Sequence, residues 1–273
     1  MLPTRHLFPT RHLMPLTRLL LAPLATLLIV LSPLPSEATT RLNVAVAANF
    51  SAPALEISEA FEAQTGIEVM ISSGSSGKFY AQILHGAPFD VFLAADSLSI
   101  AALIDQGLAE SSDHFTYAVG QIALWSPDPA LLADQQAAIA VLKAARFNRL
   151  ALANPLVAPY GAAAQEVLKH LDLESAWPDK RIQGQSIGQT YQFIASGNAD
   201  LGFVALSQII QSTGPDPQGQ GSAWLPPQSW YQPLTQDAAR LTQAKNPEQA
   251  RAFLRFLRSP GALAIMTRYG YQQ

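Results

Sequence analysis

The sequence contains no cysteine among its 273 residues. Disulfide bonds, thiolate metal sites, cysteine catalysis and a lipid-modified cysteine are therefore excluded, and the stability of the fold must come from packing. Charged residues are also sparse, at 14% of the chain, and the formal net charge is −3 at pH 7. Because the chain has no basic patch, we expect no nucleic-acid partner.

The first 38 residues have the pattern of a secretory signal peptide. Three arginines precede an apolar stretch over residues 19–34, and Ser36 and Ala38 place small residues before a cleavage site. Prolines interrupt this short apolar stretch, which argues against a retained membrane anchor, since a stable span needs about 20 apolar residues. We expect residues 1–38 to be removed and the protein to be exported to the periplasm.

Short apolar stretches alternate with helix-forming stretches along the rest of the chain. The pattern predicts strands over residues 41–48, 67–71 and 89–95, each followed by a helix, and the same alternation recurs from residue 150 onwards. This alternation is typical of parallel sheets covered by helices on both faces. The sequence therefore predicts the α/β fold class.

These elements form two groups, so we expect two doubly wound α/β lobes. The first lobe is predicted to comprise residues 39–120 and the second residues 121–228. The remaining segment, 229–273, is too short to fold alone, so we expect it to return to the first lobe. The two passages of the chain between the lobes would then form a two-crossing hinge.

The stretch ISSGSSGK, residues 71–78, joins a predicted strand to a predicted helix. It does not match the phosphate-binding pattern G-x-x-x-x-G-K-[ST], because position 72 is serine and position 79 is phenylalanine. Ser75 and Lys78 do match the S-x-x-K pattern of serine acyl-transferring enzymes, in which the lysine takes the serine proton. An exported serine acyl enzyme is therefore one alternative, although no lysine in the chain is followed by Thr-Gly or Ser-Gly.

An anion site is another interpretation of the same stretch. Backbone N–H groups at a helix start lack intrahelical partners and carry partial positive charge, while serine adds a hydroxyl donor. Suitable donors recur at four strand-to-helix turns, those of Asn49, Ser76, Tyr160-Gly161 and Ile187-Gly188. Such turns gather at the carboxyl edge of a doubly wound sheet. Two turns from each lobe around one cleft would together offset the dehydration of a small dianion.

Several stretches in combination resemble the periplasmic molybdate-binding proteins that supply ABC importers. The matching stretches are VAANF at 46–50, ISSGSSG at 71–77, GAPFDVFLAAD at 86–96, NP at 154–155, APYG at 158–161 and ADLGFV at 199–204. The resemblance covers residues 41–273. It implies a type II periplasmic binding fold that closes on molybdate or tungstate, an ABC permease at the inner membrane as partner, and a monomer without enzymatic activity or cofactor.

By the family's pattern, four backbone amides hold the oxyanion, and the side chains of the first two assist: Asn49, Ser76, Tyr160 and Ile187. No direct ligand of a metal cation is implied. Some family members carry Ser or Thr at the site position that is Ala48 here, and some carry a ligating Tyr at the position of Ala205. We expect the hydroxyl of Tyr160 to compensate in part for these missing hydroxyls.

The expected contacts are all hydrogen-bond donors, which restricts the ligand. Hydrogen phosphate carries a proton and needs an acceptor, and leaving that hydroxyl unpaired costs about 1–3 kcal/mol. Molybdate, tungstate and sulfate are fully deprotonated at neutral pH and suit such a pocket. Sulfate is smaller, and a sulfate-type binding protein remains a second alternative.

Overall fold

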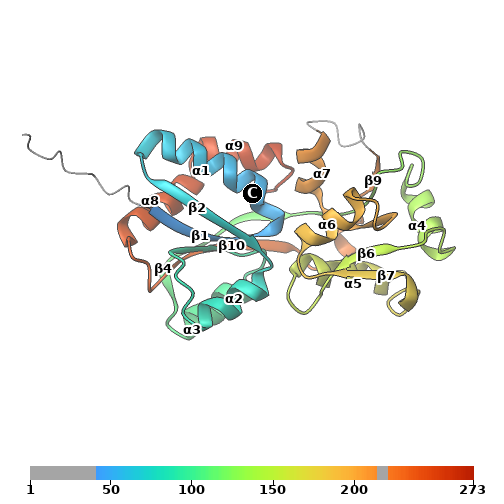
Figure 1. Ribbon diagram of the computed structural model, residues 1–273, viewed down its shortest axis with the longest axis horizontal. Coiled ribbons are helices and arrows are strands. Elements are labelled where there is room, and N and C mark those ends of the chain that lie inside the picture. The colour runs from blue at the N-terminus through green and yellow to red at the C-terminus, as the bar shows by residue number, and fades with distance from the viewer. Residues whose placement is uncertain (1–40, 214–220) are drawn as a thin grey trace, which may run out of the picture. The chain divides into compact units, whose positions relative to one another are not determined.

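The computed structural model describes residues 41–213 and 221–273, which form two five-stranded sheets with their helices (Figure 1). The predicted signal peptide, residues 1–38, lies outside the described residues. In the part of the chain that is described, none of the helices combines the length and the hydropathy needed to cross a bilayer.

The first sheet has the strand order β2-β1-β3-β10-β4. Its strands are β1 (Arg41–Ala47), β2 (Glu68–Gly74), β3 (Val91–Leu93), β4 (Ala109–Gly120) and β10 (Leu234–Leu241). The helices of this lobe are η1 (Ala48–Phe50), α1 (Ser51–Thr65), α2 (Ser76–Leu84), α3 (Leu98–Asp105), α8 (Pro247–Leu257) and α9 (Pro260–Arg268).

The second sheet has the strand order β7-β6-β8-β5-β9. Its strands are β5 (Ile122–Ser126), β6 (Leu150–Ala153), β7 (Arg181–Gly184), β8 (Leu201–Ala205) and β9 (Ser222–Trp224). The helices of this lobe are α4 (Gln135–Lys143), α5 (Pro159–His170), η2 (Pro178–Lys180), α6 (Ile187–Ala195), α7 (Leu206–Thr213) and η3 (Gln228–Trp230).

Helices cover both faces of the first sheet, as the alternation of β1 requires. Val44 and Val46 point into a core that α1, α8 and α9 close with side chains such as Phe61 and Phe253. Ala45 lies between them in sequence and points to the other face, where α2 and α3 pack. The prediction of two α/β lobes is therefore confirmed, and Figure 1 shows the helices on either side of the strands.

Both sheets are mixed, whereas the sequence analysis predicted parallel sheets. Strand β10 runs antiparallel to β3 and β4, and β5 runs antiparallel to β8 and β9. The reason is the connectivity: β4 leads directly into β5 of the second sheet, and β10 returns from that sheet after β9.

Strand β2 is longer than the sequence predicted. It continues beyond Ile71 to Gly74, and α2 begins only two residues later, at Ser76. Residues Ser72 and Ser73 pair in parallel register with Ala45 and Val46 of β1. Backbone pairing with a buried central strand thus outweighs the low strand propensity of serine and glycine.

Candidate oxyanion site

A small cavity lies where strand ends of the two sheets meet. Its volume is about 10 Å³, which is about the room that one water molecule needs. The first lobe lines it with Ala47, Ala48, Asn49, Gly74, Ser75, Ser76 and Ala95, and the second lobe with Ala158, Pro159, Tyr160 and Ile187.

Helix starts supply most of this lining. The helix η1 begins directly after β1, and α2 begins after β2 with one residue between them, while α5 and α6 begin in the turns that follow β6 and β7. Proline at the first position of α5 favours its start, and the Ser186 side chain accepts a hydrogen bond from the Gln189 N–H at the start of α6. Four helix N-termini therefore surround one cavity and direct partial positive charge towards it.

All five residues that the sequence analysis assigned to the site line this cavity: Ala48, Asn49, Ser76, Tyr160 and Ile187. They come from helix starts of both lobes, which are in close contact here. A Cβ placed on Gly188 would lie 3.2 Å from the Cβ of Ala48. The structure thus brings the predicted residues together; whether each binds a ligand stays a prediction.

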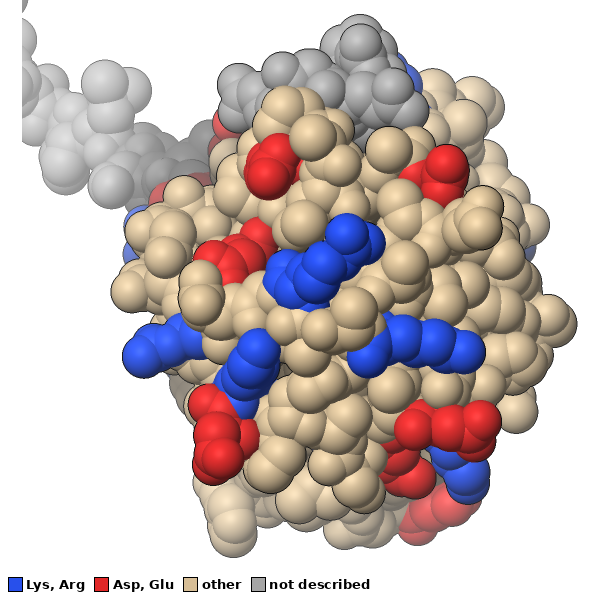
Figure 2. All heavy atoms as spheres, turned by 90° about the vertical axis from the view of Figure 1, so that its right-hand side faces the viewer, with Lys and Arg blue, Asp and Glu red and all other residues tan. Residues whose placement is uncertain are grey.

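The cavity has an uncharged lining. None of the described residues that line it is Asp, Glu, Lys, Arg or His. Its one titratable group is the Tyr160 phenol, whose pKa is raised well above the ordinary value, mainly by burial and further by Tyr271 and Tyr117. On the face shown in Figure 2, basic and acidic side chains are interspersed among uncharged ones. The described lining therefore contributes no charged side chain, and the partial positive charge expected there is that of the helix starts.

Ser76 can both accept and donate at this site. Its Oγ is buried and accepts a hydrogen bond from the Ala95 N–H at 2.9 Å. Since a hydroxyl also has one proton to donate, that proton remains available for an acceptor in the cavity. This arrangement agrees with the donor role predicted for Ser76.

The Asn49 side chain is engaged elsewhere, contrary to the expectation that it assists the ligand. Its Nδ2 donates to Gln236 Oε1 at 2.8 Å and to the Tyr271 hydroxyl at 3.0 Å. The backbone carbonyl oxygen of Asn49 accepts from the hydroxyls of Ser207 and Tyr271, both at 2.7 Å. Because both Nδ2 protons are used, the Asn49 side chain has no donor left for the cavity in this conformation, and the ligand role of its backbone N–H stays a prediction.

The Tyr160 hydroxyl also belongs to this buried network rather than to the cavity. It accepts a hydrogen bond from Gln236 Nε2 at 3.2 Å, and Gln236 Oε1 accepts another from the Tyr117 hydroxyl at 2.9 Å. A Cβ on Gly120, at the end of β4, would overlap the Tyr160 hydroxyl. The Tyr160 hydroxyl is also hydrogen-bonded to the Tyr271 hydroxyl, so in this conformation the Tyr160 proton is used within the network. The compensation that we expect from Tyr160 for the hydroxyl missing at Ala48 stays a prediction.

This hinge network, formed by Asn49, Tyr117, Tyr160, Ser207, Gln236 and Tyr271, was not anticipated from the sequence. Its members lie on both lobes, on the returning strand β10 and near the chain's end. Gln236 and Tyr271 are 187 and 222 positions from Asn49. No local pattern connects residues so far apart.

Ser75 is a further cavity residue, which the sequence analysis considered only as a nucleophile. It is 4% exposed, and its hydroxyl has no hydrogen-bond partner among the described residues. Lys78 lies exposed on α2. A serine acyl enzyme needs a Ser–Lys hydrogen bond, and the structure does not show one here.

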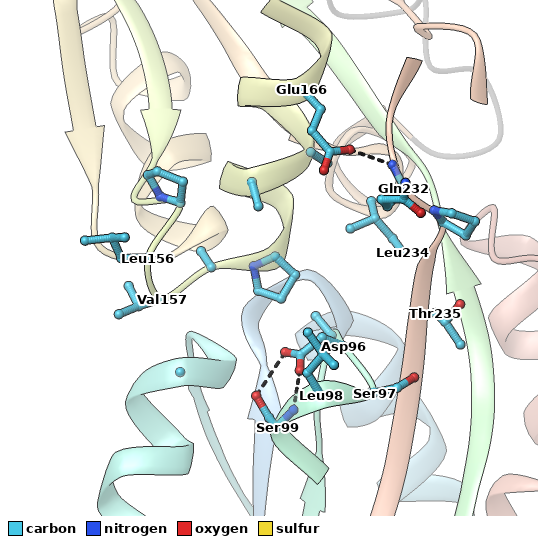
Figure 3. Close-up of a pocket in the computed structure, with 18 residues that line it drawn as sticks. Asp96, Ser97, Leu98, Ser99, Leu156, Val157, Glu166, Gln232, Leu234 and Thr235 are labelled. Atoms are coloured by element: carbon cyan, nitrogen blue, oxygen red, sulfur yellow. Dashed lines mark hydrogen bonds between the residues drawn. The ribbon is translucent and has the colours of Figure 1, made fainter. Parts of the chain in front are cut away.

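A larger cleft of about 630 Å³ adjoins the small cavity and shares Ala95, Ala158 and Pro159 with it. Figure 3 shows that its acidic side chains already have partners: Asp96 accepts from the backbone N–H and hydroxyl of Ser99, and Glu166 accepts from the N–H of Gln232. In the described residues there is also no cluster of three His, Cys, Asp or Glu that would hold a metal ion. The donor-lined cavity is therefore the better candidate site.

The fold and the cavity define a two-lobed binding protein, and comparison with known proteins agrees. A family model described as bacterial extracellular solute-binding protein matches residues 42–272. Since this match covers most of the sequence, the chain belongs to that family.

Two relatives are each 46% identical to this chain. The molybdate-binding protein ModA of Azotobacter vinelandii aligns over 233 residues, which are 84% of this chain and 89% of that protein. The molybdate-binding protein ModA of Rhodobacter capsulatus aligns over 227 residues, 83% of this chain and 86% of that protein. Among solved structures, the A. vinelandii periplasmic molybdate-binding protein superposes with a TM-score of 0.80 at 41% identity, covering 85% of this chain and 99% of that one.

Proposed function

We propose that this protein is a periplasmic solute-binding protein that captures molybdate or tungstate between its lobes and delivers it to an ABC importer. The observation that carries the proposal is the small cavity, which helix starts from both lobes surround and no charged side chain lines. The relatives at 46% identity are named molybdate-binding proteins, which supports the choice of ligand.

The mechanism we infer is closure of the lobes on the anion. Across the cleft, the Gly77 N–H donates to the Val157 carbonyl at 3.0 Å, and the Ser207 hydroxyl donates to the Asn49 carbonyl. When the lobes separate, these contacts break and the helix starts are exposed to solvent. An anion that bonds to donors of both lobes favours the closed state by its differential affinity.

The donor chemistry favours a fully deprotonated tetrahedral anion. A carboxylate that would accept a proton from hydrogen phosphate is absent from the described lining, so that hydroxyl would stay unpaired at a cost of about 1–3 kcal/mol. Sulfate has the right charge but shorter bonds, so its oxygens would reach fewer donors at once. This distinguishes our proposal from the sulfate alternative, which the identities to molybdate-binding relatives do not favour.

The cellular context follows from the same proposal. Residues 1–38 would direct export to the periplasm, and the closed protein would dock as a monomer on an ABC permease at the inner membrane. No resident cofactor and no enzymatic step are part of this function. The serine acyl enzyme is not favoured, because Ser75 lacks a basic partner in the described structure and the relatives are binding proteins.

Calorimetric titration of the mature protein tests the proposal. Molybdate and tungstate are expected to bind at one site. Phosphate should bind about 5- to 150-fold more weakly, because its hydroxyl would stay unpaired at a cost of about 1–3 kcal/mol, and sulfate should also bind more weakly, because its shorter bonds reach fewer donors at once. Equal, weak binding of all four anions would refute the specificity that we infer. Covalent labelling of Ser75 by a serine-reactive β-lactam would instead support the acyl enzyme.

A further inference from the structure

Ser75 has a buried hydroxyl that the fold itself does not use. The residue is the N-cap of α2, with φ −85° and ψ 147°, yet its side chain does not accept the capping hydrogen bond. Serine at this position normally accepts from a backbone N–H of the first turn. The hydroxyl oxygen is fully buried and has no hydrogen-bond partner among the described residues.

The position of this hydroxyl indicates what would pair with it. Ser75 is 4% exposed and lines the small cavity together with the helix starts of both lobes. A buried polar group without a partner is costly, so such groups in native proteins usually mark a bound water, an ion or a ligand. The missing partner of Ser75 therefore belongs in the cavity.

Few side chains around the cavity remain to donate a hydrogen bond. The amide of Asn49 and the hydroxyl of Tyr160 are both engaged in the hinge network. Ala48 and Ile187 have no polar side-chain atom. The hydroxyls of Ser75 and Ser76 are thus the side-chain donors that the described lining leaves available.

We propose that the Ser75 hydroxyl is a direct ligand of the bound oxyanion and donates a hydrogen bond to one of its oxygens. This inference rests on the proposed function and adds a residue to the predicted set. The two adjacent serines would act differently. The Ser76 hydroxyl also accepts a hydrogen bond from the Ala95 N–H, whereas the Ser75 hydroxyl has no partner among the described residues when no ligand is bound.

The test combines affinity and stability measurements on single variants. Ser75→Ala is expected to weaken molybdate binding by about ten- to a hundredfold in calorimetric titration, the range for a hydrogen bond to a charged group. The thermal unfolding temperature of the ligand-free protein should stay the same or rise, because no hydrogen bond is lost. A purely structural role would lower that temperature and leave affinity unchanged, which would overturn the inference.

Two more variants keep the result unambiguous. Ser75→Gly removes the same hydroxyl at a position where glycine is tolerated, so it should reproduce the loss of affinity. Ser73→Ala is the matched control, since Ser73 is an exposed serine of the same stretch whose hydroxyl pairs with Ser51. It should bind like the unmodified protein.

The outcomes separate the two proposals. If the unmodified protein binds molybdate and both Ser75 variants bind it within twofold as tightly, an ordered water is the partner of Ser75 and this inference alone is wrong. If the unmodified protein binds none of the four oxyanions, the proposed function itself fails, and this inference fails with it.

Discussion

At the scale of single residues, the Ser76 hydroxyl has two roles, one in the fold of the first lobe and one in the cavity. Its Oγ is buried and accepts from the Ala95 N–H, which leaves the hydroxyl proton available for another acceptor. It therefore contributes to the fold of the first lobe as well as to the cavity. Ser75 and Ser76 are neighbours of the same type, but only Ser76 should stabilise the protein without ligand.

We predict that Ser76→Ala weakens molybdate binding and also lowers the stability of the ligand-free protein. Molybdate binding should weaken by about 1–3 kcal/mol, and the free energy of unfolding without ligand should fall by a similar amount, because the Ala95 N–H is left unpaired. Titration and urea denaturation of the variant measure these two effects. An unchanged stability would mean that water replaces the lost hydroxyl at Ala95.

At the scale of elements, the approach of α2 to the second lobe depends on a glycine. Gly77 is the second residue of α2, and its N–H bonds to Val157 across the cleft. A Cβ on Gly77 would lie 2.9 Å from the Val157 Cα, which is closer than carbon atoms pack. The closed arrangement therefore requires a residue without a side chain here.

Gly77→Ala is expected to weaken molybdate binding at least tenfold, because closure would have to stop short or displace Val157. The stability of the open, ligand-free protein should not fall, since alanine favours helix over glycine by up to about 1 kcal/mol. Titration of the variant measures its affinity for molybdate, and thermal unfolding measures its stability without ligand.

Gly261→Ala provides the matched control for this variant. Gly261 is the second residue of α9, and the nearest atom to an added Cβ there is the Ser259 Oγ at 4.0 Å. This variant should leave affinity unchanged. Tight binding by Gly77→Ala would show that the lobes do not close as far as Gly77 and Val157 indicate.

At the scale of the whole molecule, an ion-pair cluster links acid conditions to unfolding. Asp113 on β4 accepts from Arg240 at 2.6 Å and from Arg251 at 2.9 Å, so it joins β4, β10 and α8. Burial alone would raise the pKa of Asp113, but the hydrogen bonds and charges of the two arginines outweigh it and lower the pKa below 3.8. The folded protein thus favours the ionised carboxylate more than the unfolded chain does.

We predict that Asp113 stabilises the protein fully above about pH 4, and that this contribution is lost as the pH falls through the lowered pKa. Asp113→Asn should reduce the free energy of unfolding by about 3 kcal/mol at neutral pH, because the buried Arg240 loses a partner. The difference from the unmodified protein should shrink in stronger acid. Urea denaturation between pH 2 and pH 7 measures it.

Glu68→Gln is the control for this experiment. Glu68 pairs with Arg41 at 2.9 Å, but the two side chains are 35% and 56% exposed, so solvent screens the pair. Its removal should change stability by less than about 1 kcal/mol. An equal loss in both variants would contradict a special role for Asp113.

The sequence by itself determined the local elements and where polar donors follow them. Alternation of apolar residues predicts the strands, and Asn49, Ser76, Tyr160 and Ile187 stand at the turns that follow them. Because parallel strands place these turns at one edge of a sheet, their convergence could be predicted as well.

Only the tertiary structure decided which of these groups are available to a ligand. It commits the Asn49 amide and the Tyr160 hydroxyl to Gln236 and Tyr271, and it leaves the Ser75 hydroxyl buried without a partner. It also reverses β10 and β5 within mixed sheets. Periodicity reports the burial of residues within one element, whereas hydrogen bonds between residues about 200 positions apart depend on how the elements pack.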